Sequence, residues 1–323
     1  MATHRFDPTT FFNTFGSHPP VLTVQDGDTV VTRTVDAAGV DAEGRKVAST
    51  PNPLTGPFEI SGAQPGDRLV VRVESVRPDR AHGFGRASLA PNVVDPAFVP
   101  EMGYDPRNDG ASWRVDLENG TVTLDRDEGP LAGLTLDLAP MLGCIGVAPA
   151  GGEAISTATS GPHGGNMDVR RLGSGATVTF PVFVPGASLF VGDAHALQGD
   201  GEVSGTGIEI SSEVRLSVRV EKGRAPIGWP RGDDGTHLFT MGNARPLDQA
   251  TQHATTEMVR WLMEELDLSA ADAGLLMSQT VRYEIGNVFD PAYTVVCRMP
   301  KARVQAVRSG SFRSGPSEGQ RPT

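Results

Sequence analysis

Two glycine-rich segments of the 323-residue chain carry the side chains best suited to chemistry. The first, residues 161–168, reads GPHGGNMD and holds His163, Asn166 and Asp168 around two adjacent glycines. Adjacent glycines let the backbone turn tightly and approach a ligand closely. An imidazole, an amide and a carboxylate are the groups that a metal site or an acid–base site uses. The alternative is a surface loop whose Asn and Asp bond to their own backbone.

The second segment, residues 192–202, follows an apolar run at 188–191 that predicts a strand. If this strand continues, Asp193 and His195 project from the same face, because side chains alternate along a strand. A carboxylate beside a histidine is a common minimum for Zn²⁺ or another divalent cation. The alternative is an acidic turn without an ion, in which His195 is a hydrogen-bonded core residue.

More polar side chains follow in the same segment. Asp200 and Glu202 repeat the spacing of Asp193 and His195, and Gln198 precedes them. Four ionisable groups close to the end of one strand are dense for a loop with only a structural role. The segment therefore favours a functional site.

Cys144 is the remaining reactive side chain, within MLGCIGVAPA at 141–150. A cysteine nucleophile needs a base or a positive environment, and the neighbours of Cys144 in the sequence are apolar. We expect a buried, inert thiol. The flanking Gly143 and Gly146 favour close packing or a close approach of the backbone to a ligand.

The elements that must position these residues are mainly strands. The chain has 39 Gly and 25 Pro, which favours many turns between short strands. Residues 20–36 predict a hairpin with the turn QDGD (25–28), and residues 58–76 repeat the pattern around PGD (65–67). Apolar residues alternate again over 213–222. The pattern predicts a β-sandwich or barrel-like body.

Helices are expected only near the C-terminus. Apolar spacing predicts a helix over 246–268 and a second over 269–279 with Ser269 as N-cap. The fold class is therefore mainly β with a smaller α/β C-terminal segment. The expected domains are a β-rich catalytic body at 1–225, an α/β segment at 226–300 packing on it and a disordered tail at 301–323.

Composition and charge limit the partners. The net charge is −11, and residues 301–323 hold five Lys/Arg and one Glu, so the tail is +4 and the remainder is −15. An acidic body repels phosphate, which argues against nucleic acid and anionic membranes. Two cysteines, no secretory signal and no apolar run of about 18 residues predict a cytoplasmic protein without a membrane span. We expect a homo-oligomer, a dimer, that acts on a small molecule.

Several segments resemble the acetamidase/formamidase family of amide hydrolases. They are PVLTVQDGDTV (20–30), NPLTGPFEISGAQPGDRLVV (52–71), MLGCIGVAPAGGE (141–153), SGPHGGNMD (160–168) and VPGASLFVGDAHALQGDGEVSGTGIE (184–209). The match extends over most of residues 1–300. The resemblance implies a β-rich amidase fold, hydrolysis of the C–N bond of short aliphatic amides and a divalent metal at the two central loops.

A mechanism that fits these residues assigns three roles. The expected metal ligands are His163, Asp168, Asp193 and His195, for zinc first and calcium or another divalent ion as the alternative. The expected proton-transfer and oxyanion groups are Glu202 or Asp200 as the base, and Asn166 or a backbone N–H near Gly164 and Gly165 as the donor. The residues expected to contact substrate are Gly146, Gly164, Gly165 and Gln198.

Three other functions stay open on the sequence. A metal-dependent hydrolase on the same scaffold could act on a cyclic amide, a carbamate or a urea-like compound. A non-catalytic β module could hold a small ligand or Ca²⁺. A Cys144-based amidase would be inactivated by thiol reagents and indifferent to chelators.

Overall fold

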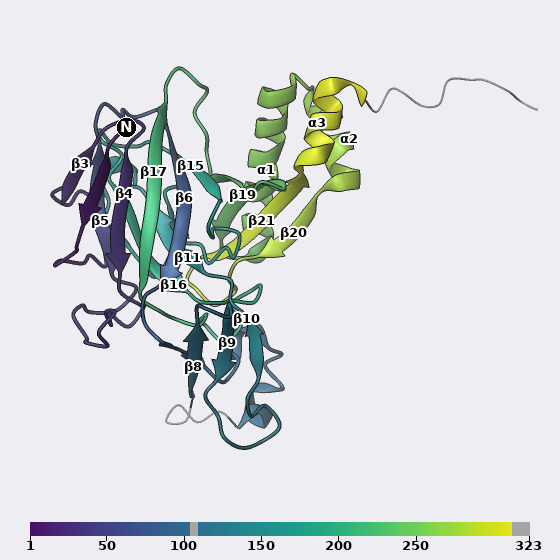
Figure 1. Ribbon diagram of the computed structural model, residues 1–323. Coiled ribbons are helices and arrows are strands. Elements are labelled where there is room, and N and C mark those ends of the chain that lie inside the picture. The colour runs from purple at the N-terminus through teal and green to yellow at the C-terminus, as the bar shows by residue number, and fades with distance from the viewer. Residues whose placement is uncertain (104–108, 312–323) are drawn as a thin grey trace, which may run out of the picture.

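Two β-sheets pack face to face and form the body of the protein (Figure 1). The structure is a computed structural model and describes residues 1–103 and 109–311. One apolar core fills the space between the sheets, with Val30 and Val71 from the larger sheet and Phe58 and Ile145 from the smaller one. The prediction of a mainly β fold with a smaller C-terminal α/β part is confirmed.

The described residues form four sheets. The large sheet contains, in spatial order, β1 (Thr3–Phe6), β4 (Thr29–Thr34), β17 (Ser212–Glu221), β6 (Arg68–Pro78), β15 (Thr177–Pro181), β18 (Arg231–Asp233), β19 (His237–Ala244), β21 (Tyr293–Pro300) and β20 (Arg282–Ile285). The second contains β13 (Ser160–Gly161), β14 (Gly164–Asn166), β11 (Met141–Gly146), β16 (Leu189–His195), β5 (Leu54–Ile60) and β3 (Leu22–Val24). The smaller two contain β10 (Thr135–Asp137), β9 (Thr121–Leu124), β8 (Gly110–Asp116) and β7 (His82–Arg86), and the pair β12 (Ile155–Ser156) and β2 (Thr14–Phe15).

The α-helices of the described chain gather at the C-terminal part of the large sheet. They are α1 (Leu247–Leu266), α2 (Ala270–Thr280) and α3 (Lys301–Ser309). Figure 1 shows them together beside β19–β21, while β8–β10 project from the opposite end of the body. α1 packs on β19 and β21, and Ser269 caps α2 as predicted, since its hydroxyl accepts from the Asp272 amide. Over residues 1–103 and 109–311, no helix is both long and apolar enough to cross a membrane.

The prediction of hairpins at the two Gly-Asp turns is wrong. β3 pairs with β5 in one sheet and β4 pairs with β1 and β17 in the other, so the first turn carries the chain between layers. The second turn likewise joins β5 to β6 of the opposite sheet. The Asp28 carboxylate accepts from the amides of Ala2 and Gln25, and these bonds hold the corner. Turn chemistry alone does not specify whether the next strand pairs with the previous one or faces it across a core.

The large sheet continues across the predicted boundary at residue 225. β18 pairs with β15, so residues 226–300 continue the large sheet of the body. The disordered tail is wrong for residues 301–309, which form α3 with Val304 buried. Apolar contact with the helix layer orders this basic segment, and residues 312–323 lie outside the described residues.

Candidate metal and acid–base centre

Asp193 and His195 reach one buried space from the end of β16. All seven residues of this strand are buried, and the two polar side chains lie two positions apart as the alternation predicts. Gly143 of β11 lies beside them. A Cβ atom on Gly143 would fall 2.5 Å from Asp168 Oδ1 and 2.8 Å from Asp193 Oδ2. The glycine therefore leaves the room in which the two carboxylates converge.

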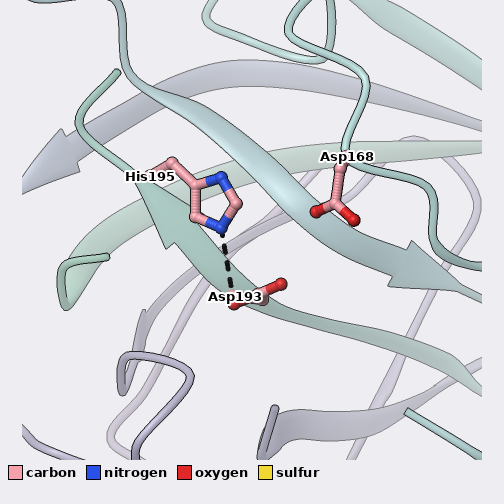
Figure 2. A group of neighbouring side chains, drawn as sticks. All are labelled: Asp168, Asp193 and His195. Carbon is pink, nitrogen blue, oxygen red and sulfur yellow. Dashed lines mark ion pairs between the residues drawn. The ribbon is translucent and has the colours of Figure 1, made fainter. Parts of the chain in front are cut away.

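Asp168 joins this pair from the other glycine-rich segment. Its backbone N–H donates to the Gly143 carbonyl at 3.1 Å, directly after β14. Asp168, Asp193 and His195 each offer a ligand atom, and these atoms lie within 4.8 Å of one another. Figure 2 shows the two carboxylates and the imidazole ring facing a common space. The fold thus brings the two segments together.

Two carboxylates that the sequence analysis missed complete the cluster. His195, Glu202 and Glu209 form a second grouping, and Asp168, Glu202 and Asp290 form a third. Glu209 itself forms an antiparallel backbone bridge with His195, and it ends one of the family-like stretches. Asp290 has no local signal, because it lies in the β20–β21 connection, far from the glycine-rich segments in sequence.

Asparagines hold the outer carboxylate oxygens. Asn52 donates to Asp193 Oδ2 at 3.2 Å, while Asn166 and Asn287 donate to Asp168 Oδ2 at 3.0 and 3.1 Å. The atoms that face inward are Asp168 Oδ1, Asp193 Oδ1 and His195 Nε2. None makes a hydrogen bond of good geometry with the described residues, and the contacts of His195 Nε2 with Asp193 and Glu209 are ion pairs at 3.5 and 3.2 Å. Buried polar atoms without partners are rare in proteins, and their convergence fits a bound cation.

Gln198 fixes the orientation of His195 and does not face the common space. Its Nε2 donates to the carbonyls of Asp168 and Gly286, so its Oε1 is the acceptor for His195 Nδ1 at 2.8 Å. Nδ1 then carries the hydrogen, and Nε2 turns toward Glu209 Oε1 at 3.2 Å and Asp193 Oδ1 at 3.5 Å. Gln198 supports a ligand in the manner that metal sites require. A substrate-binding role has no support from these contacts.

The ionisation of the cluster follows from its burial. Burial, together with the nearby carboxylates, raises the pKa values of Asp168 and Glu202 well above the ordinary range. The same causes raise the pKa values of Glu209 and Asp290 to about 7. Burial lowers the pKa of His195, but Glu209 and Asp193 outweigh it and the net shift is strongly upward. Protons or a cation must therefore neutralise the cluster.

Two predicted site residues lie outside the groupings. Asp200 is solvent-exposed and pairs with Arg170 at 2.7 Å, so it does not share the space with Glu202. His163 is buried with its ring in an edge contact with Phe15, at a centroid distance of 5.0 Å. Burial lowers the pKa of His163 to about 4. His163 is thus a neutral buried imidazole whose Nε2 has no hydrogen-bond partner within the described chain, and none of the three groupings includes it.

The predicted substrate and oxyanion groups serve the packing of the site. A Cβ on Gly146, Gly164 or Gly165 would meet a backbone oxygen at 2.5 Å, so these glycines allow strands to approach one another. Asn166 Nδ2 donates to Asp168 Oδ2 and to Asp290 Oδ2, at 3.0 and 2.6 Å. Its two N–H groups are therefore engaged, and Asn166 holds carboxylates in place where an oxyanion donor was expected.

Cys144 has the surroundings of a structural thiol. Its side chain is fully buried, with Sγ 3.6 Å from the Thr157 carbonyl. Burial and the nearby Asp193 and Asp168 carboxylates raise the pKa of the thiol well above its ordinary value. Both Cys144 and Cys297 are free. A thiolate at Cys144 is strongly disfavoured.

Comparison with known proteins identifies the family. The family model described as the acetamidase/formamidase family matches residues 8–152 and 147–302. The chain belongs to the acetamidase/formamidase family. The resemblance in the glycine-rich segments and at residues 20–30 and 52–71 therefore extends through the C-terminal part of the chain, which provides Asn287 and Asp290.

Relatives within the acetamidase/formamidase family share the fold. The chain is 27% identical to an acetamidase from Mycolicibacterium smegmatis over 245 residues, 60% of this chain and 59% of that protein. Acetamidase structures from Bacillus halodurans and Yersinia enterocolitica superpose with a TM-score of 0.80 each, at 29% and 32% identity. Each superposition covers 94% of this chain. It covers 99% of the Bacillus halodurans chain and 93% of the Yersinia enterocolitica chain. The chain spans about half the length of the curated relatives it matches, at 51–59%.

Replacement of Gly143 by Ala should disrupt the convergence of Asp168 and Asp193. The added Cβ would overlap both carboxylates, so we expect the free energy of unfolding to fall by about 1–3 kcal/mol. We also expect less divalent metal to be retained. Urea denaturation and elemental analysis measure the two effects. Gly199→Ala is the matched control, since nothing lies within 4 Å of its Cβ position. Equal stability and metal content in the two variants would contradict this account of Gly143.

The buried His163 predicts a pH-dependent loss of stability. Its pKa is about 4 in the folded protein and 6.5 when unperturbed, so below pH 6.5 the unfolded state binds the proton first. Stability contributed by neutral His163 is complete above pH 6.5 and is lost as the pH falls toward 4, by about 3 kcal/mol. The His163→Gln variant lacks this titrating group, so its free energy of unfolding should change less than that of wild type between pH 6.5 and pH 4. Parallel pH profiles for wild type and variant would refute the expectation.

Proposed function

We propose that the protein is a metal-dependent amidase that hydrolyses the C–N bond of short aliphatic amides, such as formamide and acetamide, to a carboxylate and ammonia. Family membership and the similarity of nearly the whole chain to acetamidase structures support this reaction class. Asp168, Asp193 and His195 would hold the divalent ion. Zinc is the first expectation for a His/carboxylate set, and calcium is the alternative.

The observation that carries the proposal is the set of inward-facing atoms that make no hydrogen bond of good geometry. Asp168 Oδ1, Asp193 Oδ1 and His195 Nε2 are buried, and each is held from behind by an amide or carbonyl group. A neutral ligand does not offset the negative charge of several carboxylates in one enclosed space, whereas a divalent cation does.

The reaction needs an activated water and a proton for the leaving nitrogen, because an amide nitrogen donates into its carbonyl and is a poor leaving group. A divalent ion, when bound, polarises a carbonyl oxygen and lowers the pKa of water. Glu202 belongs to two of the three groupings. Glu202 takes a proton as the water oxygen bonds to the carbonyl carbon. It returns this proton to nitrogen as the C–N bond breaks and ammonia leaves.

The rival functions make different demands on the same residues. A Cys144 nucleophile has no support, because burial and two carboxylates oppose its thiolate. A calcium-binding module without turnover predicts stabilisation by metal and no ammonia release. A hydrolase of cyclic amides, carbamates or urea-like compounds shares the metal chemistry and differs in the substrate panel. Cytoplasmic location and a homodimeric state remain expectations from the sequence.

Ammonia release from formamide, acetamide and propionamide should depend on bound metal. Incubation with a chelator should abolish release, and the divalent ion should restore it. His195→Ala should lose both the metal and the activity, since it removes a ligand from two groupings. His82→Ala is the control, because His82 is exposed on β7. Retention of both metal and amide hydrolysis by His195→Ala would rule out this assignment. A lactam, a carbamate and urea complete the panel.

Replacement of Glu202 by Gln should separate proton transfer from metal binding. We expect metal content near that of wild type and a fall in kcat of about 10²–10⁴, the usual contribution of a general base. Asp200→Asn is the matched control, because Asp200 is paired with Arg170 at the surface, and its kcat should remain near that of wild type. Unchanged turnover in Glu202→Gln would remove Glu202 from the mechanism.

A further inference from the structure

Asn52 differs from the other asparagines around the cluster. Asn166 and Asn287 are buried, whereas Asn52 is half-buried and lies on the connection between β4 and β5. Exposed residues 43–47 and 49–51 precede it. Its backbone has a left-handed φ of 35°, which directs the side chain inward from a surface segment. Asn52 therefore stands at the solvent side of the buried carboxylates.

The NH₂ group of Asn52 lies among hydrogen-bond acceptors. It donates to Asn166 Oδ1 at 2.9 Å and to Asp193 Oδ2 at 3.2 Å, with the Thr157 carbonyl at 3.5 Å. Asn166 Oδ1 must act as an acceptor, because its own NH₂ group donates to Asp168 and Asp290. Two acceptors at fixed positions match the two N–H groups of an unsubstituted amide.

The Asn52 side chain ends in a primary carboxamide on a methylene group, which is acetamide attached to the backbone. We propose that Asn166 Oδ1 and Asp193 Oδ2 form the subsite for the NH₂ group of the substrate, and that Asn52 occupies this subsite in the free protein. The inference rests on the proposed amidase function. Substrate binding is then an exchange of one carboxamide for another.

A placeholder of this kind has a physical reason. Buried acceptors without a donor are costly, so the subsite is more stable when a side chain fills it in the absence of substrate. Rotation about the Asn52 side-chain bonds is sufficient to vacate it, and half-exposed side chains change rotamer rapidly. The subsite lies on Asp193, whose other oxygen faces His195 Nε2 at 3.5 Å. The leaving nitrogen would therefore depart beside a carboxylate, which stabilises ammonium.

The same geometry sets a specificity. A primary amide satisfies both acceptors, whereas an N-methyl amide offers at most one N–H and places a methyl group against a polar atom. The subsite selects unsubstituted amides on the nitrogen side. It places no such demand on the acyl group, which would extend away from Asn166 and Asp193.

Asn52→Gly is the first test, because glycine accepts the left-handed φ and removes the carboxamide. Competition by the side chain disappears, so KM for acetamide should fall about fivefold relative to wild type, and kcat is measured in parallel. Asn52→Asp is the second variant, since Asp tolerates the same φ but cannot donate and is repelled by Asp193. It should also lower KM. Asn119→Ala, at an exposed turn, is the control and should leave both constants unchanged.

Other results would overturn the inference. A large fall in kcat with unchanged KM in both Asn52 variants would mean that Asn52 only positions Asp193. N-Methylacetamide turned over as efficiently as acetamide would exclude the two-acceptor subsite. Binding without turnover gives an independent measure, because acetamide should raise the melting temperature of Asn52→Gly more than that of wild type. If wild type released no ammonia from any amide, the proposed function would fail, and the melting-temperature comparison would still decide whether a carboxamide subsite exists.

Discussion

The structure is organised around buried negative charge. Five carboxyl groups surround one imidazole, and within the described chain His195 is the basic side chain that pairs with them. Burial makes the charged forms expensive unless a proton or a cation compensates them. A proton on His195 Nε2 and a divalent ion at the same place are therefore alternative solutions. The neighbouring amide groups hydrogen-bond to the outer carboxylate oxygens. The inner carboxylate oxygens are left to face either the protonated imidazole or a divalent ion.

Backbone strain accompanies this arrangement. Among residues 1–103 and 109–311, seven non-glycine residues have positive φ values. Four of them, Asn52, Asp168, Asp193 and Glu202, belong to the site or contact it. Left-handed conformations of this kind cost about 1–3 kcal/mol each and persist where the surroundings hold them. Asn and Asp tolerate them best. The buried β11 and β16 ladder, with Gly143 between the carboxylates, provides a rigid support for that strain.

The C-terminal part of the chain is integral to the site. Its strands extend the large sheet, and the connection between β20 and β21 carries Asn287 and Asp290 onto Asp168 and Asn166. Val288 and Gly201 bond to each other through their backbones, which ties this connection to the segment that holds Glu202. The N-terminal side contributes Asn52. The buried cluster and its supporting amides are thereby assembled from three distant parts of the sequence.

The sequence by itself determined the local features. An apolar run located β16, alternation located β17 and apolar periodicity located α1. The spacing of Asp193 and His195 placed both side chains on one face. These patterns depend only on neighbouring residues. Tertiary structure decided which sheet each strand joined, that Asp200 faces solvent while Glu202 is buried, and that Glu209, Asp290 and Asn52 meet the cluster. Those outcomes depend on packing between segments distant in sequence, and no local pattern records it.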